Sequence, residues 1–163
     1  DIETGRPVGA GVPGEIQVRS ESAMAGYLPD TENPFLDGWY RTGDIGHLDE
    51  DGFLRITDRL KEMVKVRGFQ VAPAEVEAVL HGHPAVRDCA VFGVADDRLG
   101  QRVVAAVVLR PGAAAPGLDE LRTHVEATLP RTAAPRELHI VDEVPRRGIG
   151  KIDRQALLTR FGP

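Results

Sequence analysis

The stretch from Asp58 to Glu77 reads DRLKEMVKVRGFQVAPAEVE, and its pattern predicts the local structure on either side of it. Its first residues end a strand and cross a charged bend, after which alternating valines and polar residues predict a hairpin. Arg67 and Gly68 stand where that hairpin turns, and a glycine readily supplies the positive φ that such turns require. Pro73 then suits the first turn of a helix. The stretch therefore predicts a strand, a hairpin and a helix in succession.

Three cations of this stretch, Arg59, Lys61 and Lys65, lie close together in the sequence. A surface hairpin commonly carries such charges for solvation, so composition by itself assigns them no function. The charge balance of the chain changes at the same place. Residues 1–57 contain 4 Lys and Arg against 11 Asp and Glu, whereas residues 58–163 contain 16 against 14. This change predicts that two structural units meet where the stretch begins.

The residues before the stretch predict a small antiparallel β unit without a helix, residues 1–58. Gly14 to Arg19 alternates polar and apolar residues, as a half-buried strand does. Trp39 to Asp44 predicts a second strand, and His47 to Leu54 predicts a hairpin in which the dipeptide Asp-Gly forms the turn.

The residues after the stretch predict an α+β unit, residues 59–163, in which helices flank a central three-stranded sheet. Apolar residues at helical spacing from Pro73 to about Gly82 predict its first helix. Apolar runs and turn residues predict the other elements, which are strands at Val86–Val94, Arg102–Arg110 and Glu137–Val141 and helices at Leu118–Leu129 and Arg154–Phe161.

The overall composition is that of a globular protein. The 163 residues are 42% hydrophobic and 28% charged, which excludes a disordered chain. No apolar run reaches the roughly 20 residues that span a bilayer, and the second unit is too weakly basic and aromatic to predict a nucleic-acid partner. Cys89 lies in an apolar run, which predicts a buried residue. No Cys or His cluster has metal-ligand spacing, and a cytoplasmic location is the default expectation.

A second informative stretch, Gly148 to Arg154, reads GIGKIDR and places Lys151 on a glycine-rich loop. Together with the stretch from Asp58 to Glu77, and in the same order, it resembles motifs of the AMP-forming acyl-CoA synthetases, a superfamily that includes 4-coumarate ligases, fatty-acyl-CoA ligases and firefly luciferase. The resemblance covers nearly the whole chain, from Gly14 onwards. It implies an enzyme that converts a carboxylic acid and ATP to an acyl-adenylate, then transfers the acyl group to coenzyme A and releases AMP.

The sequence TGD at Thr42 to Asp44 is, taken alone, most simply an Asx turn. Its place before Arg59 is that of the superfamily's ribose-binding pair. The resemblance implies that Asp44 accepts hydrogen bonds from the ribose hydroxyls and that Arg59 assists. It also assigns Gln70 and Lys151 to the nucleotide.

The resemblance places a hinge between two catalytic poses at Lys61, where a long side chain stays solvated in both. The hairpin beyond it would line the site during thioester formation. There Lys65 is implied as a catalytic lysine and Arg67 as a contact to coenzyme A. Gly68 would let the thiol-bearing arm pass close to the backbone, although a turn glycine alone explains this residue equally well.

Lys151 is implied as the principal catalytic residue. When a carboxylate attacks the α-phosphorus of ATP, negative charge builds on the phosphoryl oxygens, and a fixed cation lowers the barrier. Most loop lysines are simply solvated, and the surrounding sequence VPRRGIGKIDR is what favours the catalytic interpretation. The superfamily usually has Ser or Thr where Arg147 stands, so the hydrogen bonding of this loop departs from the pattern.

Several superfamily features are missing from these residues: the phosphate-binding loop with its lysine, the segment that binds nucleotide and magnesium, and the acyl pocket. We therefore expect a C-terminal fragment, inactive by itself, that holds a remnant of the β-barrel subdomain and the complete mobile lid. Its partners would be ATP or AMP, coenzyme A, a carboxylic acid and the N-terminal domain of the same enzyme. We expect no metal site here, because the magnesium ligands would lie outside the fragment.

Two alternatives stay open on the sequence. In the first, the acyl group passes to a carrier-protein phosphopantetheine, as in peptide-synthetase domains or fatty-acyl-AMP ligases, although peptide-synthetase domains more often have aspartate where Lys61 stands. In the second, the chain is a non-enzymatic, lid-like module that binds a partner protein. A luciferase-type oxidation is remote, because nothing in these residues supplies it.

Overall fold

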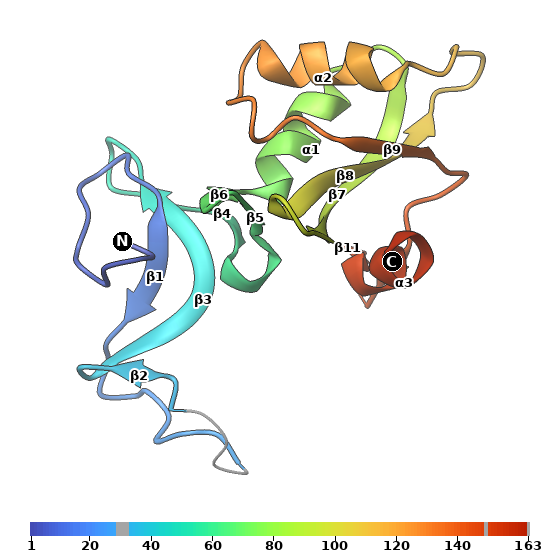
Figure 1. Ribbon diagram of the computed structural model, residues 1–163. Helices are drawn as coiled ribbons and strands as arrows, with labels where there is room; N and C mark the ends of the chain where they lie inside the picture. Colours follow the sequence, from blue (N-terminus) through green and yellow to red (C-terminus); the bar gives the residue numbers. More distant parts are fainter. Residues whose placement is uncertain (29–32, 149, 163) are drawn as a thin grey trace. The chain divides into compact units, whose positions relative to one another are not determined.

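The computed structural model describes residues 1–28, 33–148 and 150–162, and it divides into two compact units, Asp1–Lys61 and Glu62–Pro163. Each unit has its own sheet (Figure 1). The 3₁₀ helix Leu60–Glu62 contains the boundary, just after the position where the charge balance of the sequence changes.

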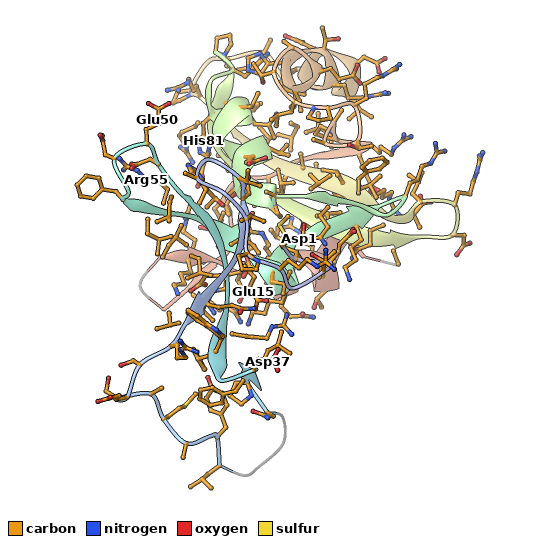
Figure 2. The ribbon with its side chains drawn as sticks, turned by 90° about the vertical axis from the view of Figure 1, so that its left-hand side faces the viewer. Asp1, Glu15, Asp37, Glu50, Arg55 and His81 are labelled. Carbon is orange, nitrogen blue, oxygen red and sulfur yellow. The ribbon has the colours of Figure 1, made fainter. Side chains whose placement is uncertain are left out.

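The first unit is an antiparallel sheet formed by β1 (Gly14–Val18), β2 (Phe35–Leu36), β3 (Trp39–Leu48) and β4 (Leu54–Arg59). The long strand β3 pairs with each of the other three. Gly52 has a φ of +82° in the turn between β3 and β4, where the sequence predicts a hairpin. Arg41 of β3 forms a 2.7 Å ion pair with Glu15 of β1, which is labelled in Figure 2. This pair and the backbone ladder together hold β1 against β3.

The second unit mixes helices and strands, as the sequence predicts. Among the residues that the structure describes, its elements are β5 (Val64–Val66), β6 (Phe69–Val71), α1 (Pro73–His81), β7 (Val86–Asp96), β8 (Gly100–Leu109), α2 (Leu118–Glu126), β9 (Glu137–Ile140), β10 (Arg146–Arg147), β11 (Lys151–Ile152) and α3 (Arg154–Phe161). None of the helices in these described residues is long and apolar enough to cross a membrane.

The main sheet of this unit has five strands, in the order β6-β5-β8-β7, with β9 also alongside β8. The prediction of a three-stranded sheet is therefore wrong, because the β5–β6 hairpin joins the sheet that β7, β8 and β9 form. Val66 pairs with Gly100, and the N–H of Arg67 donates to the carbonyl oxygen of Leu99 at 2.7 Å. The β8–β9 pair is parallel and the other described pairs are antiparallel, so the α+β class is as predicted.

Both faces of the β7–β8 pair are buried. Val91 belongs to a cluster with Leu80 of α1 and Leu121 of α2, whereas Phe92, the next residue, belongs to a cluster with Leu157 of α3. Successive residues of a strand point to opposite faces, so α1 and α2 cover one face and α3 covers the other (Figure 1). A strand buried on both faces reads as a continuous apolar run. This explains why the sequence of β7 and β8 lacks alternation.

Arg154, the first residue of α3, ties that helix to the rest of the unit. Its Nε donates to the carbonyl oxygen of Val91 at 2.9 Å, its Nη1 to Glu62 at 2.6 Å and its Nη2 to Glu77 at 2.7 Å. Only 17% of the Arg154 side chain is exposed. A largely buried cation thus neutralises two carboxylates from separate elements.

We expect Arg154→Ala to lower the free energy of unfolding of the second unit by about 3 kcal/mol, because removing one partner leaves desolvated carboxylates without their cation. Urea denaturation followed by circular dichroism measures this change. The matched control is Gln155→Ala, an exposed neighbour on the same helix, which should change the free energy by less than about 0.5 kcal/mol. Equal stability of the two variants would contradict this role for Arg154.

Candidate functional site

Lys151 lies on a small hairpin of its own. Strands β10 and β11 pair Arg146 with Ile152 and Arg147 with Lys151. Gly148 and Gly150 have positive φ values of 57° and 94°, a conformation that side chains disfavour, which explains both glycines of this loop. Ile149, between them, lies outside the described residues. Lys151 is exposed and has neither an ion pair nor a side-chain hydrogen bond to any described residue, so its ammonium group is available to a ligand.

The base of this hairpin is fixed to α3. The N–H of Asp153 donates to the carbonyl oxygen of Pro145 at 2.8 Å, and the Asp153 carboxylate accepts the N–H of Ala156 at 3.1 Å as the helix cap. The next residue is Arg154, already bonded to the main sheet. Lys151 therefore extends from a short hairpin whose outgoing end is held firmly. Arg147, which stands where the resembling superfamily usually has Ser or Thr, is exposed on the same hairpin.

The second hairpin, β5–β6, turns at the two residues Arg67 and Gly68. Both have positive φ, 52° and 85°, which matches the type I′ turn of two-residue hairpins. Asn, Asp and Gly usually occupy such positions, so the left-handed conformation of an arginine is uncommon. A Cβ added to Gly68 would have no atom within 4 Å. The backbone at Gly68 is therefore open to the approach of a ligand.

Lys65 and Gln70 face each other across this hairpin. Lys65 is exposed, and its backbone N–H donates to the Gln101 side chain at 2.7 Å. Gln70 is partly exposed, and its buried Oε1 has no hydrogen-bond partner among the described residues. An unpaired buried acceptor is uncommon in folded proteins, and only the exposed part of this side chain is accessible to a ligand.

Asp44 and Arg59 belong to the first unit and lie opposite each other on β3 and β4. Arg59 Nε contacts Asp44 Oδ1 at 2.7 Å, and the N–H of Asp44 donates to the Thr42 hydroxyl at 3.0 Å. Gly43, with a φ of +71°, allows the turn that presents the carboxylate. The second carboxylate oxygen of Asp44 can accept a hydrogen bond from a ligand hydroxyl. Lys61 is exposed and is the last residue of the first unit.

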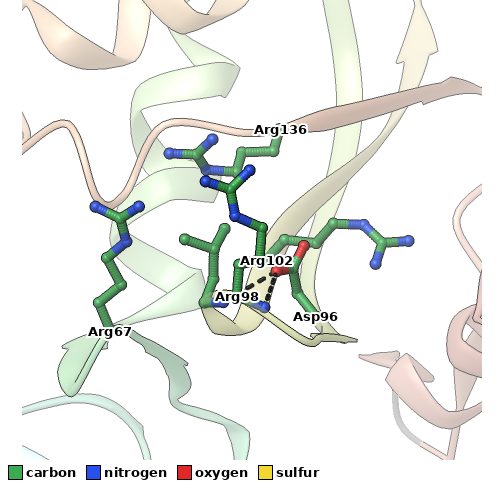
Figure 3. Close-up of a pocket in the computed structure, with 6 residues that line it drawn as sticks. Arg67, Asp96, Arg98, Arg102 and Arg136 are labelled. Atoms are coloured by element: carbon green, nitrogen blue, oxygen red, sulfur yellow. Dashed lines mark hydrogen bonds between the residues drawn. The ribbon is translucent and has the colours of Figure 1, made fainter.

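A pocket of about 360 Å³ in the second unit brings four arginines together (Figure 3). They are Arg67 in the turn of β5–β6, Arg98 between β7 and β8, Arg102 on β8 and Arg136 just before β9. Only Arg67 was assigned to a site from the sequence. Arg98 lies in the β7–β8 turn and Arg102 shortly after it, Arg136 lies 34 residues beyond Arg102, and the three share no motif, so no local signal predicted that they line one pocket.

The charges of this pocket are only partly neutralised. Arg102 donates to Glu137 at 2.9 Å and to the carbonyl oxygen of Ala95 at 2.8 Å. Partial burial raises the pKa of Glu137, but hydrogen bonds from Arg102 and His139 outweigh it and lower that pKa below its ordinary value. Glu137 is thus a carboxylate that balances Arg102.

The other three arginines of the pocket have no ion pair with a described residue. The pocket also contains one carboxylate, Asp96, which accepts the backbone N–H groups of Arg98 and Leu99 at 3.0 Å each. The pocket therefore keeps an excess of positive charge suited to a ligand with several phosphate groups.

One arrangement resembles a catalytic triad but cannot act as one. His81 (labelled in Figure 2) has Nδ1 3.5 Å from Cys89 Sγ and Nε2 3.5 Å from Asp88 Oδ1. Cys89 is fully buried, as predicted, and burial raises the pKa of its thiol to about 12. The thiol therefore stays protonated and lacks access to substrate. No group of three or more His, Cys, Asp or Glu side chains suited to a metal ion occurs in the described part of the chain.

Comparison with known proteins places these features in a family. Residues 75–151 match the family model of the AMP-binding enzyme C-terminal domain. A probable 2-succinylbenzoate–CoA ligase of Mycobacterium tuberculosis is 53% identical over 152 residues, which cover 91% of this chain and 40% of that protein. A 4-coumarate–CoA ligase-like protein of Oryza sativa subsp. japonica is 47% identical over 165 residues, which cover 99% of this chain and 30% of that protein. The chain thus spans less than half the length of these relatives.

Solved structures agree with the sequence comparison. The amide bond synthetase McbA from Marinactinospora thermotolerans superposes with a TM-score of 0.85 at 40% identity, over 99% of this chain and 33% of that one. ATP-bound MatB from Rhodopseudomonas palustris superposes with a TM-score of 0.87 at 32% identity, with the same two coverages. The resemblance inferred from the two motifs is confirmed: the chain belongs to the AMP-forming adenylate-forming enzymes and carries their C-terminal domain.

Proposed function

We propose that this chain is the C-terminal part of an acid–CoA ligase, in which residues 1–58 end the N-terminal domain and residues 59–163 form a mobile lid. The observation that carries the proposal is the presence of two separate cationic hairpins on one unit, Lys151 on β10–β11 and Lys65 with Arg67 on β5–β6. Two successive reactions of one acyl group develop negative charge at different atoms. A lid that carries two such hairpins can serve each reaction in turn.

The first reaction is adenylation. A carboxylate oxygen of the acid forms a bond to the α-phosphorus of ATP, and the bond from that phosphorus to pyrophosphate breaks. Lys151 would hold its ammonium group against the oxygens that gain charge in this transition state. In the first unit, Asp44 would accept hydrogen bonds from the ribose hydroxyls, with Arg59 beside it. In the second unit, Gln70 would contact the nucleotide. The partial exposure of the Gln70 side chain on β6 is compatible with that role.

The second reaction is thioester formation. The sulfur of coenzyme A forms a bond to the acyl carbon, the bond from that carbon to the AMP oxygen breaks, and the thiol proton leaves. Rotation at Lys61 would exchange the Lys151 hairpin for the β5–β6 hairpin. The position of Lys61 at the last residue of the first unit supports a hinge there. The open space at Gly68 supports passage of the thiol-bearing arm beside the backbone.

The arginine pocket favours coenzyme A over a carrier protein as the acceptor. Coenzyme A carries a diphosphate and a 3′-phosphate on its nucleotide, whereas a carrier-bound phosphopantetheine arm has no nucleotide. Three arginines without ion pairs to described residues, Arg67, Arg98 and Arg136, match an anion of that charge. Arg67 belongs both to this pocket and to the turn that contains Gly68. The phosphates and the thiol arm of one molecule would therefore meet neighbouring parts of the lid.

In the enzyme that contains this chain, we expect Lys151→Ala to slow adenylation by about 10²–10³-fold, the effect of one lost charge-stabilising donor. Transfer from a preformed acyl-adenylate to coenzyme A should remain, because Lys151 would then be away from the reacting atoms. Gly68→Leu should do the reverse. Pyrophosphate exchange and single-turnover thioester formation measure the two reactions separately.

The control for Gly68→Leu is Gly112→Leu. Gly112 also has a positive φ, 76° against 85° for Gly68, and a Cβ there would likewise have no atom within 4 Å. The Gly112→Leu variant thus introduces the same kind of backbone strain at a position outside the β5–β6 hairpin. We expect both reactions to persist in this variant. If Lys151→Ala and Gly68→Leu each lost both reactions equally, with folding intact, the division of work between the hairpins would be refuted.

We expect Arg136→Ala to raise the KM for coenzyme A by about tenfold, the effect of one charge-assisted hydrogen bond, and to leave adenylation unchanged. If Arg136 binds the 3′-phosphate, the same variant should raise the KM for 3′-dephospho-coenzyme A less than it raises the KM for coenzyme A. Arg110→Ala removes an exposed arginine outside the pocket and serves as the control. A KM for coenzyme A that is the same in the Arg136 and Arg110 variants would favour a carrier protein as the acceptor.

A further inference from the structure

We infer that Arg146 and Asp88 form a positioning pair that holds the β10–β11 hairpin and thereby aims Lys151. This inference rests on the proposed role of Lys151 in adenylation. Neither Arg146 nor Asp88 touches a reacting atom in this proposal. Both would act through the lysine.

Arg146 bridges the lysine loop and the main sheet. Its Nη2 donates to Asp88 Oδ1 at 2.9 Å and to Asp88 Oδ2 at 2.8 Å. Its Nη1 donates to the carbonyl oxygen of Gly150 at 3.0 Å. Gly150 immediately precedes Lys151, so one guanidinium joins the peptide group before the lysine to strand β7. Because its donors are engaged in this way, Arg146 is poorly suited to bind a phosphate.

Asp88 is itself held firmly. Its Oδ1 also accepts the N–H of Cys89 at 2.9 Å, and Nε2 of His81 lies 3.5 Å away. Partial burial raises the pKa of Asp88, but the hydrogen bonds and positive charge of Arg146, together with hydrogen bonds from Cys89 and His81, outweigh it and lower that pKa below its ordinary value. Asp88 thus remains a carboxylate at neutral pH. Asp88 is thus a fixed anion on the sheet that can anchor Arg146 and the hairpin that carries it.

The lysine loop needs this anchor because its own backbone is permissive. Gly148 and Gly150, both with positive φ, give the loop little intrinsic rigidity. The outgoing end is secured by Asp153 and Arg154, as described above, but the turn itself is tied down by the Arg146 guanidinium. A displacement of about 1 Å at a catalytic group can cost on the order of 10²-fold in rate. Holding Gly150 in place is therefore a direct way to protect adenylation.

The test uses Asp88→Asn, which removes the charge but keeps the shape of the side chain. In the enzyme that contains this chain, we expect kcat for adenylation to fall about tenfold while KM for ATP and for the acid stays within twofold. Thioester formation from a preformed acyl-adenylate should be unchanged. In a Lys151→Ala background, Asp88→Asn should slow adenylation by less than twofold, because a positioning residue has nothing left to position.

A second readout does not depend on activity. Trypsin cleaves after Arg147 and Lys151, and Asp88→Asn leaves both sites intact. We expect the initial rate of cleavage at these two bonds, followed by mass spectrometry, to rise at least threefold in Asp88→Asn. Glu126→Gln is the matched control. It removes a carboxylate at the end of α2 that pairs with Arg122 and Arg131, away from the hairpin. It should change neither the cleavage nor the kinetics.

The inference is overturned if Asp88→Asn slows adenylation equally with and without Lys151, if both reactions fall together with the free energy of unfolding, or if neither cleavage nor adenylation changes. A failure of the proposed function has a different signature: Lys151→Ala alone would then leave adenylation at the wild-type rate.

Discussion

Strands β7 and β8 pair along their whole length, and the burial of both faces of this pair organises the second unit. Because both faces of the pair are apolar, both must be covered to be removed from water. Helices α1 and α2 cover one face, and α3 covers the other. Both candidate functional hairpins of this unit are then attached to this pair. The β5–β6 hairpin joins β8 at Gly100, and the hairpin with Lys151 is tied to β7 through Asp88 and Val91.

The charged groups of the second unit fall into two classes that differ in their partners. Arg146 and Arg154 are engaged by carboxylates and by backbone carbonyls, so they hold structure together. Lys151, Arg98 and Arg136 extend from the surface without an ion pair to any described residue. Arginines engaged on several sides resist displacement, whereas exposed cations without partners gain most from an incoming anion. This distinction separates the cations that tie structural elements together from those that remain unpaired at the surface of the described residues.

The β5–β6 and β10–β11 hairpins of the second unit share several structural features. Each is short, each turns through residues with positive φ, and each presents a lysine that is exposed to solvent. In both, the strands beside the turn fix the position of the lysine backbone, while the lysine side chain lies exposed to solvent. The β5–β6 hairpin extends the main sheet, whereas β10–β11 forms a separate one, so the two lysines belong to independent structural elements.

Local patterns in the sequence determined the α+β class, the helix that begins at Pro73, the turns at Gly52 and Gly68, and the glycine loop before Lys151. These features depend on residues a few positions apart, and backbone preferences act over that range. The size of the main sheet was mispredicted because the attachment of β5 to β8 joins Val66 to Gly100, and three-residue strands give only a weak signal.

Only the tertiary structure brought together Arg67, Arg98, Arg102 and Arg136, or set Asp88 against Arg146. Most of these contacts join residues that are far apart in the sequence, and an arginine outside any motif looks the same whether it binds solvent, a carboxylate or a ligand. Its partner is decided by where the fold places its backbone. The sequence alone thus determined the turns and the glycine loop on which the candidate lysines lie, whereas the packing of helices on both faces of β7 and β8 decided what surrounds them.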